Sequence, residues 1–194
     1  MSEAPRTIAR FFGEYVPAQL ARLEPSLAGF SSPGAVVFEL GAAGAWSLRI
    51  TAGRASVTAG VDPEPLVHIA VAEADFEPIV VVGAERFQND APEHQLVAAR
   101  VLTIDQDRAR LLREAPGSVA LKLTAPGGLE HVLTLTLGNA PPKPGTPDCE
   151  IACTLEDFWA LQSGAKNAFE LLMDGKLKMS GKVELAMALA AALG

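Results

Sequence analysis

Short runs in which hydrophobic and polar residues alternate recur along most of the chain, and this two-residue period predicts β-strands. Three such runs lie in the first half of the chain and two lie in the second half. Their sequences are GAVVFEL, AWSLRI and RASVTAG in the first half, and SVALKLT and HVLTLTL in the second. Each group is followed by a longer run in which a strand pattern passes into a helix pattern. The chain is therefore predicted to have a mixed α+β fold.

The run that passes from strand to helix occurs twice. Residues 67–76 read VHIAVAEADF and residues 149–158 read CEIACTLEDF, so the pair Asp75–Phe76 recurs 82 positions later. In the second copy, Thr154 and Asp157 fit a capping box, in which hydroxyl and carboxylate each satisfy a free amide. Ala72 takes the cap position in the first copy, which predicts a weaker helix start.

A change in composition divides the chain at the same place as the repeat. All ten basic residues before Pro116 are arginine, and all six after it are lysine. Pro116 and Gly117 are a pair that breaks regular structure. Downstream of both copies, RVLTID before the helical QDRARLLRE resembles KLKMSG before KVELAMALAAAL. We therefore predict two repeats, residues 1–115 and residues 116–194.

The last twenty residues contain the strongest hydrophobic signal. Residues 176–180 alternate as a strand, but no charged residue appears from Leu185 to Gly194. A helix that is apolar on every side does not face water stably. Each large side chain in it contributes about 1.5–3 kcal/mol when fully buried. This helix must therefore lie in a core or against an apolar ligand.

Composition and charge narrow the class of protein. The chain has 194 residues, 49% hydrophobic and 20% charged, with a mean hydropathy of +0.22 and a formal net charge of −7. An acidic chain is a poor match for nucleic acid, which needs a basic surface, and the same charge disfavours docking on anionic lipid. No run reaches the roughly 18 apolar residues of a membrane helix. The first residues lack the pattern of a secretory signal, so a cytoplasmic protein is expected.

No known catalytic or metal-binding motif is present. Cys149 and Cys153 share one face of a predicted strand at a spacing too wide for a disulfide, so both are expected to be free and buried. His68 is expected to be a solvated or hydrogen-bonded strand residue, and His94 to be exposed. His131 follows Glu130, but neighbouring strand residues point to opposite faces, which argues against a general base. Residues 41–48, GAAGAWSL, are expected to form a turn, and Trp46 and Trp159 to pack in the interior.

Residues 154–193 resemble the sterol carrier protein type 2 (SCP2) family, also called non-specific lipid-transfer proteins. The resemblance is carried by the acidic-Asp-Phe helix start, the glycine-bounded helix that follows, the motif GKLKMSG at 175–181 and the Leu-Ala helix at Leu185. The first half resembles the N-terminal part of the same family, with an amphipathic helix around FFGEYVPAQLARL followed by short strands. It departs from the family where NDAPEHQLVAARVLTID replaces the glycine-lysine motif. The second half lacks an amphipathic first helix after residue 116, and the helix at 105–114 is a candidate for that role. PPKPGTPD is too rich in proline for a central strand.

The resemblance implies an α+β fold, a curved mixed five-stranded sheet with helices on one face, here repeated twice. It implies a non-catalytic carrier of sterols, fatty acids, fatty acyl-CoA or phospholipids in an apolar tunnel between helices and sheet. Burying about 16 carbons gains about 13 kcal/mol before costs, while micromolar binding needs about 8. The residues expected to line the tunnel are large or flexible apolar side chains: Phe158, Leu161, Phe169, Leu172, Met173, Met179, Leu185 and Leu189.

Two other classes stay open. The first is an enzyme, because domains of this resemblance are also found fused to isomerases, thiolases and acyltransferases, or an accessory lipid-binding or protein-interaction subunit of an acyl-CoA or isomerase-type enzyme system. The two predicted repeats use all 194 residues, which argues against the enzyme. The second is an adaptor whose apolar terminal helix docks on a partner protein. Neither cofactor nor metal nor catalytic residue is expected. Transient contact with membranes is compatible with the resemblance, and the residues leave the oligomeric state, the lipid and the number of pockets open.

Overall fold

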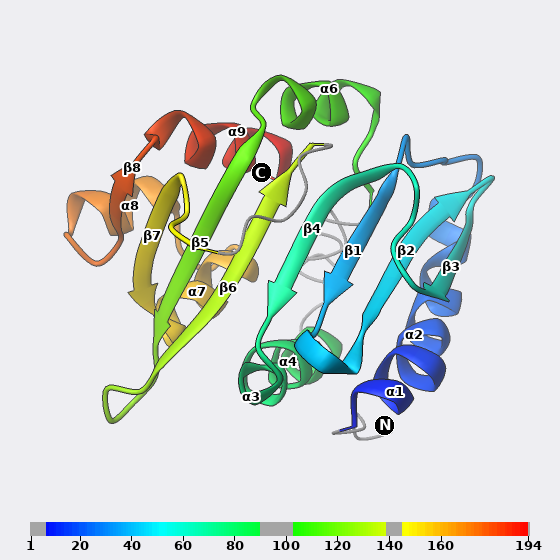
Figure 1. The fold of residues 1–194 in the computed structure, drawn as a ribbon, viewed down its shortest axis with the longest axis horizontal. Coiled ribbons are helices and arrows are strands. Elements are labelled where there is room, and N and C mark those ends of the chain that lie inside the picture. Colours follow the sequence, from blue (N-terminus) through cyan, green and yellow to red (C-terminus); the bar gives the residue numbers. More distant parts are fainter. Residues whose placement is uncertain (1–6, 90–102, 139–144, 194) are drawn as a thin grey trace.

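Helices and strands follow one another in two similar series along the chain, drawn in Figure 1. The computed structural model describes residues 7–89, 103–138 and 145–193. The first series consists of α1 (Ile8–Arg10), the π-helical η1 (Phe11–Tyr15), α2 (Val16–Leu23), the 3-10 turn η2 (Glu24–Leu27), β1 (Ala35–Glu39), the 3-10 turn η3 (Gly41–Ala43), β2 (Ala45–Thr51), β3 (Arg54–Ala59), β4 (Pro65–Val71), α3 (Glu73–Asp75), the π-helical η4 (Phe76–Val81) and α4 (Val82–Asn89). The second consists of α6 (Gln106–Glu114), β5 (Gly117–Thr124), β6 (Glu130–Leu137), β7 (Cys149–Thr154), α7 (Leu155–Gln162), α8 (Ala168–Met173), β8 (Lys178–Gly181) and α9 (Val183–Leu193).

All eight described strands belong to one sheet, in the order β3-β2-β1-β4-β6-β5-β7-β8. In each half, a first strand pairs antiparallel with its hairpin partner and parallel with the strand that leads into a helix. These first strands are β1, which lies between β2 and β4, and β5, which lies between β6 and β7. The halves meet where β4 pairs antiparallel with β6, with Val67 opposite Leu137 and Val71 opposite Leu133.

The two faces of the sheet differ in chemistry. On one face, alternate residues such as Val67, Ile69, Leu133 and Leu135 join a single hydrophobic cluster with the helices, and the helices lie behind the sheet in Figure 1. The other face carries mostly small and polar residues, because most of the intervening strand positions are serine, threonine, alanine or charged residues, with Val37, His68 and Val132 among the exceptions. The sequence alternation therefore places the core between the helices and one face, as predicted.

Aromatic side chains of the N-terminal helices close the core of the first half. The ring of Phe12 stacks on Trp46 of β2 with a centroid distance of 5.0 Å and an interplanar angle of 14°. Phe11 packs edge-on against Phe76 at 5.3 Å, tying η1 to the start of η4. Trp46 is thus an interior packing residue, as expected. Of the turn expected at 41–48, residues 41–44 form a turn and residues 45–48 belong to β2.

The predicted α+β class, the alternating strands and the helices at 106–114 and 183–193 are confirmed. The strand count differs from the expectation of two five-stranded sheets, since the described strands form one sheet of eight. The physical reason is the pairing of β4 with β6, because the backbone hydrogen bonds between these strands join the halves into one sheet. RVLTID, the run preceding α6, was expected to be a strand. Its residues 103–105 have no regular structure, and the rest of the run lies outside the described residues.

Candidate functional site

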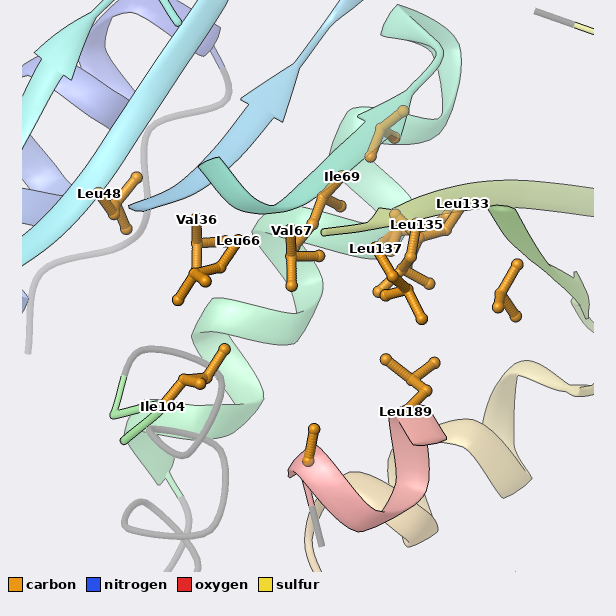
Figure 2. Close-up of a cluster of buried hydrophobic side chains, with 14 of the residues drawn as sticks. Val36, Leu48, Leu66, Val67, Ile69, Ile104, Leu133, Leu135, Leu137 and Leu189 are labelled. Atoms are coloured by element: carbon orange, nitrogen blue, oxygen red, sulfur yellow. The ribbon is translucent and has the colours of Figure 1, made fainter. Parts of the chain in front are cut away.

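The C-terminal helix α9 packs on the second half of the sheet through one side of its surface. Leu185, Ala186, Leu189 and Ala192 are all buried. A Cβ atom placed on Gly117 of β5 would come within 2.7 Å of Leu185 Cδ1, so this glycine lets the helix approach the strand closely. Figure 2 shows the side chain of Leu189 pointing toward Leu135 and Leu137 of β6.

Helix α7 begins with a well-formed cap. The Thr154 hydroxyl oxygen accepts a hydrogen bond from the Asp157 amide at 3.0 Å, which satisfies one free donor of the first turn. The Asp157 carboxylate accepts from the Thr154 hydroxyl at 2.7 Å and from Lys166 Nζ at 2.7 Å. The hydroxyl thus caps the helix as predicted, whereas the carboxylate takes a lysine in place of an amide. These contacts hold the pKa of Asp157 below its ordinary value, the hydrogen bond from Lys166 being the main cause.

Trp159 joins the two halves within the helix layer. A Cβ atom on Gly83 of α4 would come within 2.7 Å of the Trp159 ring, so the indole lies directly on the backbone of α4. The guanidinium of Arg86 lies 5.9 Å from the centroid of the same ring. The neighbouring ring of Phe158 is 4.8 Å from that of Trp159. Trp159 therefore has a packing role, as expected for this residue.

The eight residues predicted to line a tunnel fall into two groups. Leu185 and Leu189 are buried, and Phe158, Leu161 and Met179 are half-buried; of these, all but Leu161 join or pack against the common core cluster. The other three, Phe169, Leu172 and Met173, lie on α8 with their side chains exposed. Four of the predicted residues thus pack in or against the core, Leu161 is half-buried outside that cluster, and the α8 group faces solvent.

The interior between α9 and the sheet is occupied by side chains in this structure. Val119, Leu137, Cys149 and Leu189 belong to one contiguous buried cluster. A cavity of about 600 Å³ lies on the opposite face, over small residues of β2, β4 and β6, namely Ala45, Ala70 and Thr134, with Glu39 and Asp75 also in its lining. A second cavity, beside Leu20 and Leu48, measures about 10 Å³, which is too small for a lipid.

A polar clamp holds the start of α9 to the sheet. Asp148 accepts hydrogen bonds from the Ser118 amide at 3.1 Å and from Lys182 Nζ at 3.0 Å, so one carboxylate joins β5 to the residue before α9. The backbone amide of Lys182 also donates to the carbonyl of Asp148 at 2.8 Å. The hydrogen bond from Lys182 is the main cause that lowers the pKa of Asp148 from 3.8 to about 2.

The two described histidines are both buried, and each lies near a carboxylate. His131 Nδ1 lies 2.8 Å from Asp75 Oδ1, and the Val132 amide donates to the other carboxylate oxygen. His68 was expected to be solvated or hydrogen-bonded; it is buried, and its Nδ1 lies 3.3 Å from the Glu39 carboxylate without a well-aligned hydrogen bond. His94 lies outside the described residues.

Both cysteines are free and buried, as predicted. Burial raises the pKa of the Cys153 thiol to about 11, and burial also raises that of Cys149. Thiolates are the reactive and metal-binding form of cysteine, so these residues act as small hydrophobic groups. Within the described ranges, no group of three His, Cys, Asp or Glu residues has the arrangement of a metal site.

Three contacts were not predicted from the sequence: the Asp148 clamp, the Asp75–His131 pair and the packing of Trp159 on Gly83. Asp148 lay in a proline-rich segment that was interpreted only as not being a strand. The other two contacts join residues from different halves of the chain, and no local pattern signals such contacts. The repeat itself was the available signal for Asp75, because it aligned this carboxylate with Asp157.

Comparison with known proteins identifies the second half. The model of the SCP-2 sterol transfer family matches residues 98–194, which is half of the chain. The chain belongs to this family, as its resemblance predicted. Its members are in general non-catalytic lipid-binding proteins. No curated protein matches the chain.

Solved structures of related proteins match part of the chain. Sterol carrier protein 2 from Yarrowia lipolytica, in its apo form, is 27% identical, with 43% of this chain and 76% of that chain covered and a TM-score of 0.36. Palmitated SCP2L2 from Aedes aegypti is 24% identical, with coverages of 51% and 88% and a TM-score of 0.38. UbiJ-SCP2, a ubiquinone synthesis protein, is 17% identical, with coverages of 61% and 96% and a TM-score of 0.31. Family membership rests on the match at residues 98–194.

Among the described residues, every helix is too short or too polar to cross a membrane.

Proposed function

We propose that this protein binds and transfers hydrophobic ligands, of the sterol, fatty acid, fatty acyl-CoA or phospholipid class, without catalysing a reaction. The observation that carries the proposal is the family match over the segment that contains α7, α8, β8 and α9. The apolar surface that α9 and α7 turn toward the sheet supports it, since such ligands need apolar volume and few polar contacts. Phe158, Leu161, Met179, Leu185 and Leu189 are the residues we assign to the binding interior.

Ligand entry in this proposal displaces α9 from the sheet. The buried side of α9 alternates leucine with alanine, so the helix covers the sheet with two large side chains, Leu185 and Leu189, and two small ones, Ala186 and Ala192. An acyl chain that enters beneath the helix replaces these contacts with equivalent apolar contacts. The Asp148–Lys182 clamp then acts as the fixed end about which α9 swings.

We also propose that the two halves are repeats of one unit, with 116–194 as the second unit. Both halves contain a hairpin followed by a parallel strand and a helix, which supports this. Helix α6, with Ala109 and Leu112 buried, packs against α9 and serves as the amphipathic helix that the second unit otherwise lacks.

Replacing Leu189 with alanine tests the binding site. Leu189→Ala removes the side chain that occupies the interior and is expected to destabilise the ligand-free protein by about 2–5 kcal/mol. Because the space left is apolar, palmitate is expected to raise the melting temperature more in this variant than in the wild type. Displacement of a fluorescent fatty acid measures the affinity, and native mass spectrometry of the purified protein detects any lipid already bound.

Leu20→Ala is the matched control, because Leu20 is equally buried but lies on α2 in the first half. The Leu20→Ala variant is expected to be less stable than the wild type, but palmitate should raise its melting temperature no more than it raises that of the wild type. Equal responses of the two variants, together with no displacement by any acyl ligand, would contradict the proposal.

A second candidate function is that of an accessory or adaptor subunit that binds a partner protein. The observation that favours it is the exposed outer side of α9, where Met187 is 67% exposed and Val183 is also exposed. Met187→Ser distinguishes the two functions, because it changes this surface and leaves the buried side of α9 intact. A carrier keeps its fatty-acid affinity in this variant, whereas an adaptor loses binding to its partner.

A further inference from the structure

The face of the sheet opposite the helices carries a cavity that the proposed carrier function does not use. It has a volume of about 600 Å³ and lies where β4 ends, between the turn η3 and the start of β6 (Figure 1). Four of its lining residues lie side by side across neighbouring strands, in the order Ala45, Glu39, Ala70 and Thr134. The three small side chains leave room beside one glutamate, and a cavity of this volume is in the range that holds a small molecule.

Two carboxylates give this cavity a negative charge. Glu39 and Asp75 both line it, and its described lining residues include neither lysine nor arginine. Lys122 lies opposite Val132 on the same face, but its ammonium is already paired with the Glu150 carboxylate at 3.0 Å. A histidine lies near each of the two lining carboxylates, and imidazole is ordinarily neutral at about pH 8. No described base in the lining therefore cancels the charge of the cavity at that pH.

Glu39 is the carboxylate with the larger capacity for a ligand. Each oxygen of Asp75 already lies close to a nitrogen, one to the Val132 amide and one to the His131 ring. The Glu39 carboxylate lies 3.3 Å from His68 Nδ1, and His68 is 4% exposed with no hydrogen bond at this nitrogen. When Nδ1 carries no proton, it and the carboxylate oxygen are two acceptors that face each other without a donor. This edge of the cavity therefore favours a ligand that brings N–H donors and a positive charge.

We propose that the cavity binds a small molecule with primary ammonium groups, of the short diamine class, with one ammonium on Glu39 and the other nearer Asp75. An ammonium has three N–H donors and a positive charge, which match the acceptors and the charge of this lining. The described lining contains no aromatic side chain, so it lacks the cation–π contacts that hold quaternary ammonium groups. The described residues also lack a group of three metal ligands. The site lies on the face opposite α9, so this inference does not rest on the carrier function.

Titration of the purified full-length protein with 1,4-diaminobutane tests the site. Calorimetry at about pH 8 is expected to show one binding site, with an affinity that falls as the salt concentration rises because the contacts are electrostatic. Amide NMR spectra locate the site, and shifts are expected at the lining residues Gly41, Gly44, Ala70 and Thr134. Tetramethylammonium is a cation without N–H donors, so it is expected to bind at least about tenfold more weakly.

Two substitutions change the site, and each has a matched control. Glu39→Gln keeps the shape of the side chain and removes its charge, so it is expected to weaken diamine binding at least about tenfold. Glu170→Gln makes the same change on α8, at the outer end of the molecule (Figure 1). At about 0.1 M salt this distant charge is screened, so the affinity should stay within about twofold of the wild type.

The second substitution fills the cavity. Ala70→Leu places a large side chain among the lining residues and is expected to abolish diamine binding. Ala152→Leu is its control, because Ala152 is also half-buried and takes the equivalent strand position in the second half. It should leave binding intact. Circular dichroism and thermal melting confirm that all variants are folded.

Several outcomes would overturn the proposal. One is the absence of saturable diamine binding, and another is an equal loss in Glu39→Gln and Glu170→Gln. Shifts spread over the whole surface would show unspecific attraction to the net charge of −7. Tighter binding of Mg²⁺ with the same shifts would assign the carboxylates to a metal, and tighter binding of a lysine-containing peptide would assign the cavity to a partner protein. Diamine binding that Glu39→Gln and Ala70→Leu both remove, and that their controls keep, would support the proposal.

Discussion

Asp75 and Asp157 occupy equivalent places in the two halves, yet their carboxylates have different partners. Asp157 stays within its own half, where it accepts from Thr154 and Lys166. Asp75 follows an alanine cap and accepts from His131 Nδ1, when that nitrogen carries the proton, and from the Val132 amide on β6 of the other half. The second helix start is therefore stabilised locally, and the first is stabilised by the neighbouring half. The same short sequence pattern thus makes a local contact in one half and a contact between the halves in the other.

The largest expected effect comes from the junction of the halves. Leu137 of β6 is fully buried and lies opposite both Val67 of β4 and Gly117 of β5. Leu137→Ala is expected to lower the free energy of unfolding by about 2–5 kcal/mol. Because the sheet is continuous, both halves should unfold together in one transition.

Trp46, in β2, reports on the first half, whereas Trp159, in α7, reports on the second half and on its contact with α4 of the first half. Urea unfolding is followed by fluorescence in Trp46→Phe and Trp159→Phe variants, each with and without Leu137→Ala. Midpoints that shift equally in both backgrounds indicate one cooperative unit. If only the Trp159 signal shifted, the halves would be energetically independent.

A smaller effect is expected from the two aspartates themselves. Asp75→Ala leaves the buried His131 ring and the Val132 amide without this partner, at a cost of about 1–3 kcal/mol. Asp157→Ala should cost about 1 kcal/mol or less, because Lys166 is partly exposed and regains water. Chemical denaturation measures both. A larger loss for Asp157→Ala would show that the local cap, and not the cross-half contact, is the more important of the two.

The smallest expected effect is acid sensitivity at the start of α9, for which the described part of the first half has no equivalent clamp. The folded-state pKa of Asp148 is depressed to about 2 from 3.8. Its contribution to stability is therefore present above pH 3.8 and is lost as the pH falls toward 2. Asp148→Asn should flatten the stability curve in this window, as measured by urea midpoints at several pH values. An unchanged curve would mean that the clamp does not contribute to folding.

The sequence predicted local structure well and long-range contacts poorly. Alternation identified every described strand, and the run without charge after Glu184 identified α9, because such periods follow directly from backbone geometry. The pairing of β4 with β6 joins residues about 70 positions apart, and nothing in either strand specifies its neighbour. This is why two sheets were expected and one was found.

The residues predicted for the candidate site show the same contrast between what the sequence predicts locally and what depends on the overall arrangement. Leu185 and Leu189 are buried, whereas Met187 of the same apolar helix is exposed, so the absence of charge predicted the helix but not which side of it is covered. The three residues of α8 are also large and apolar: Phe169, Leu172 and Met173. Residue type alone does not reveal that α8 lies at the outer end of the molecule with only Leu171 buried. Their assignment to a tunnel stays a prediction.

Pairing β4 with β6 has a further consequence for solubility. In a separate half, one of these strands would be an edge strand, with a row of unpaired N–H and C=O groups available to other chains. The joined sheet satisfies both rows internally. At the two ends of the described sheet lie β8, which is four residues long, and β3, whose residues are mostly exposed and include Arg54. A chain that is 49% hydrophobic thus offers few sites for intermolecular β-pairing and aggregation.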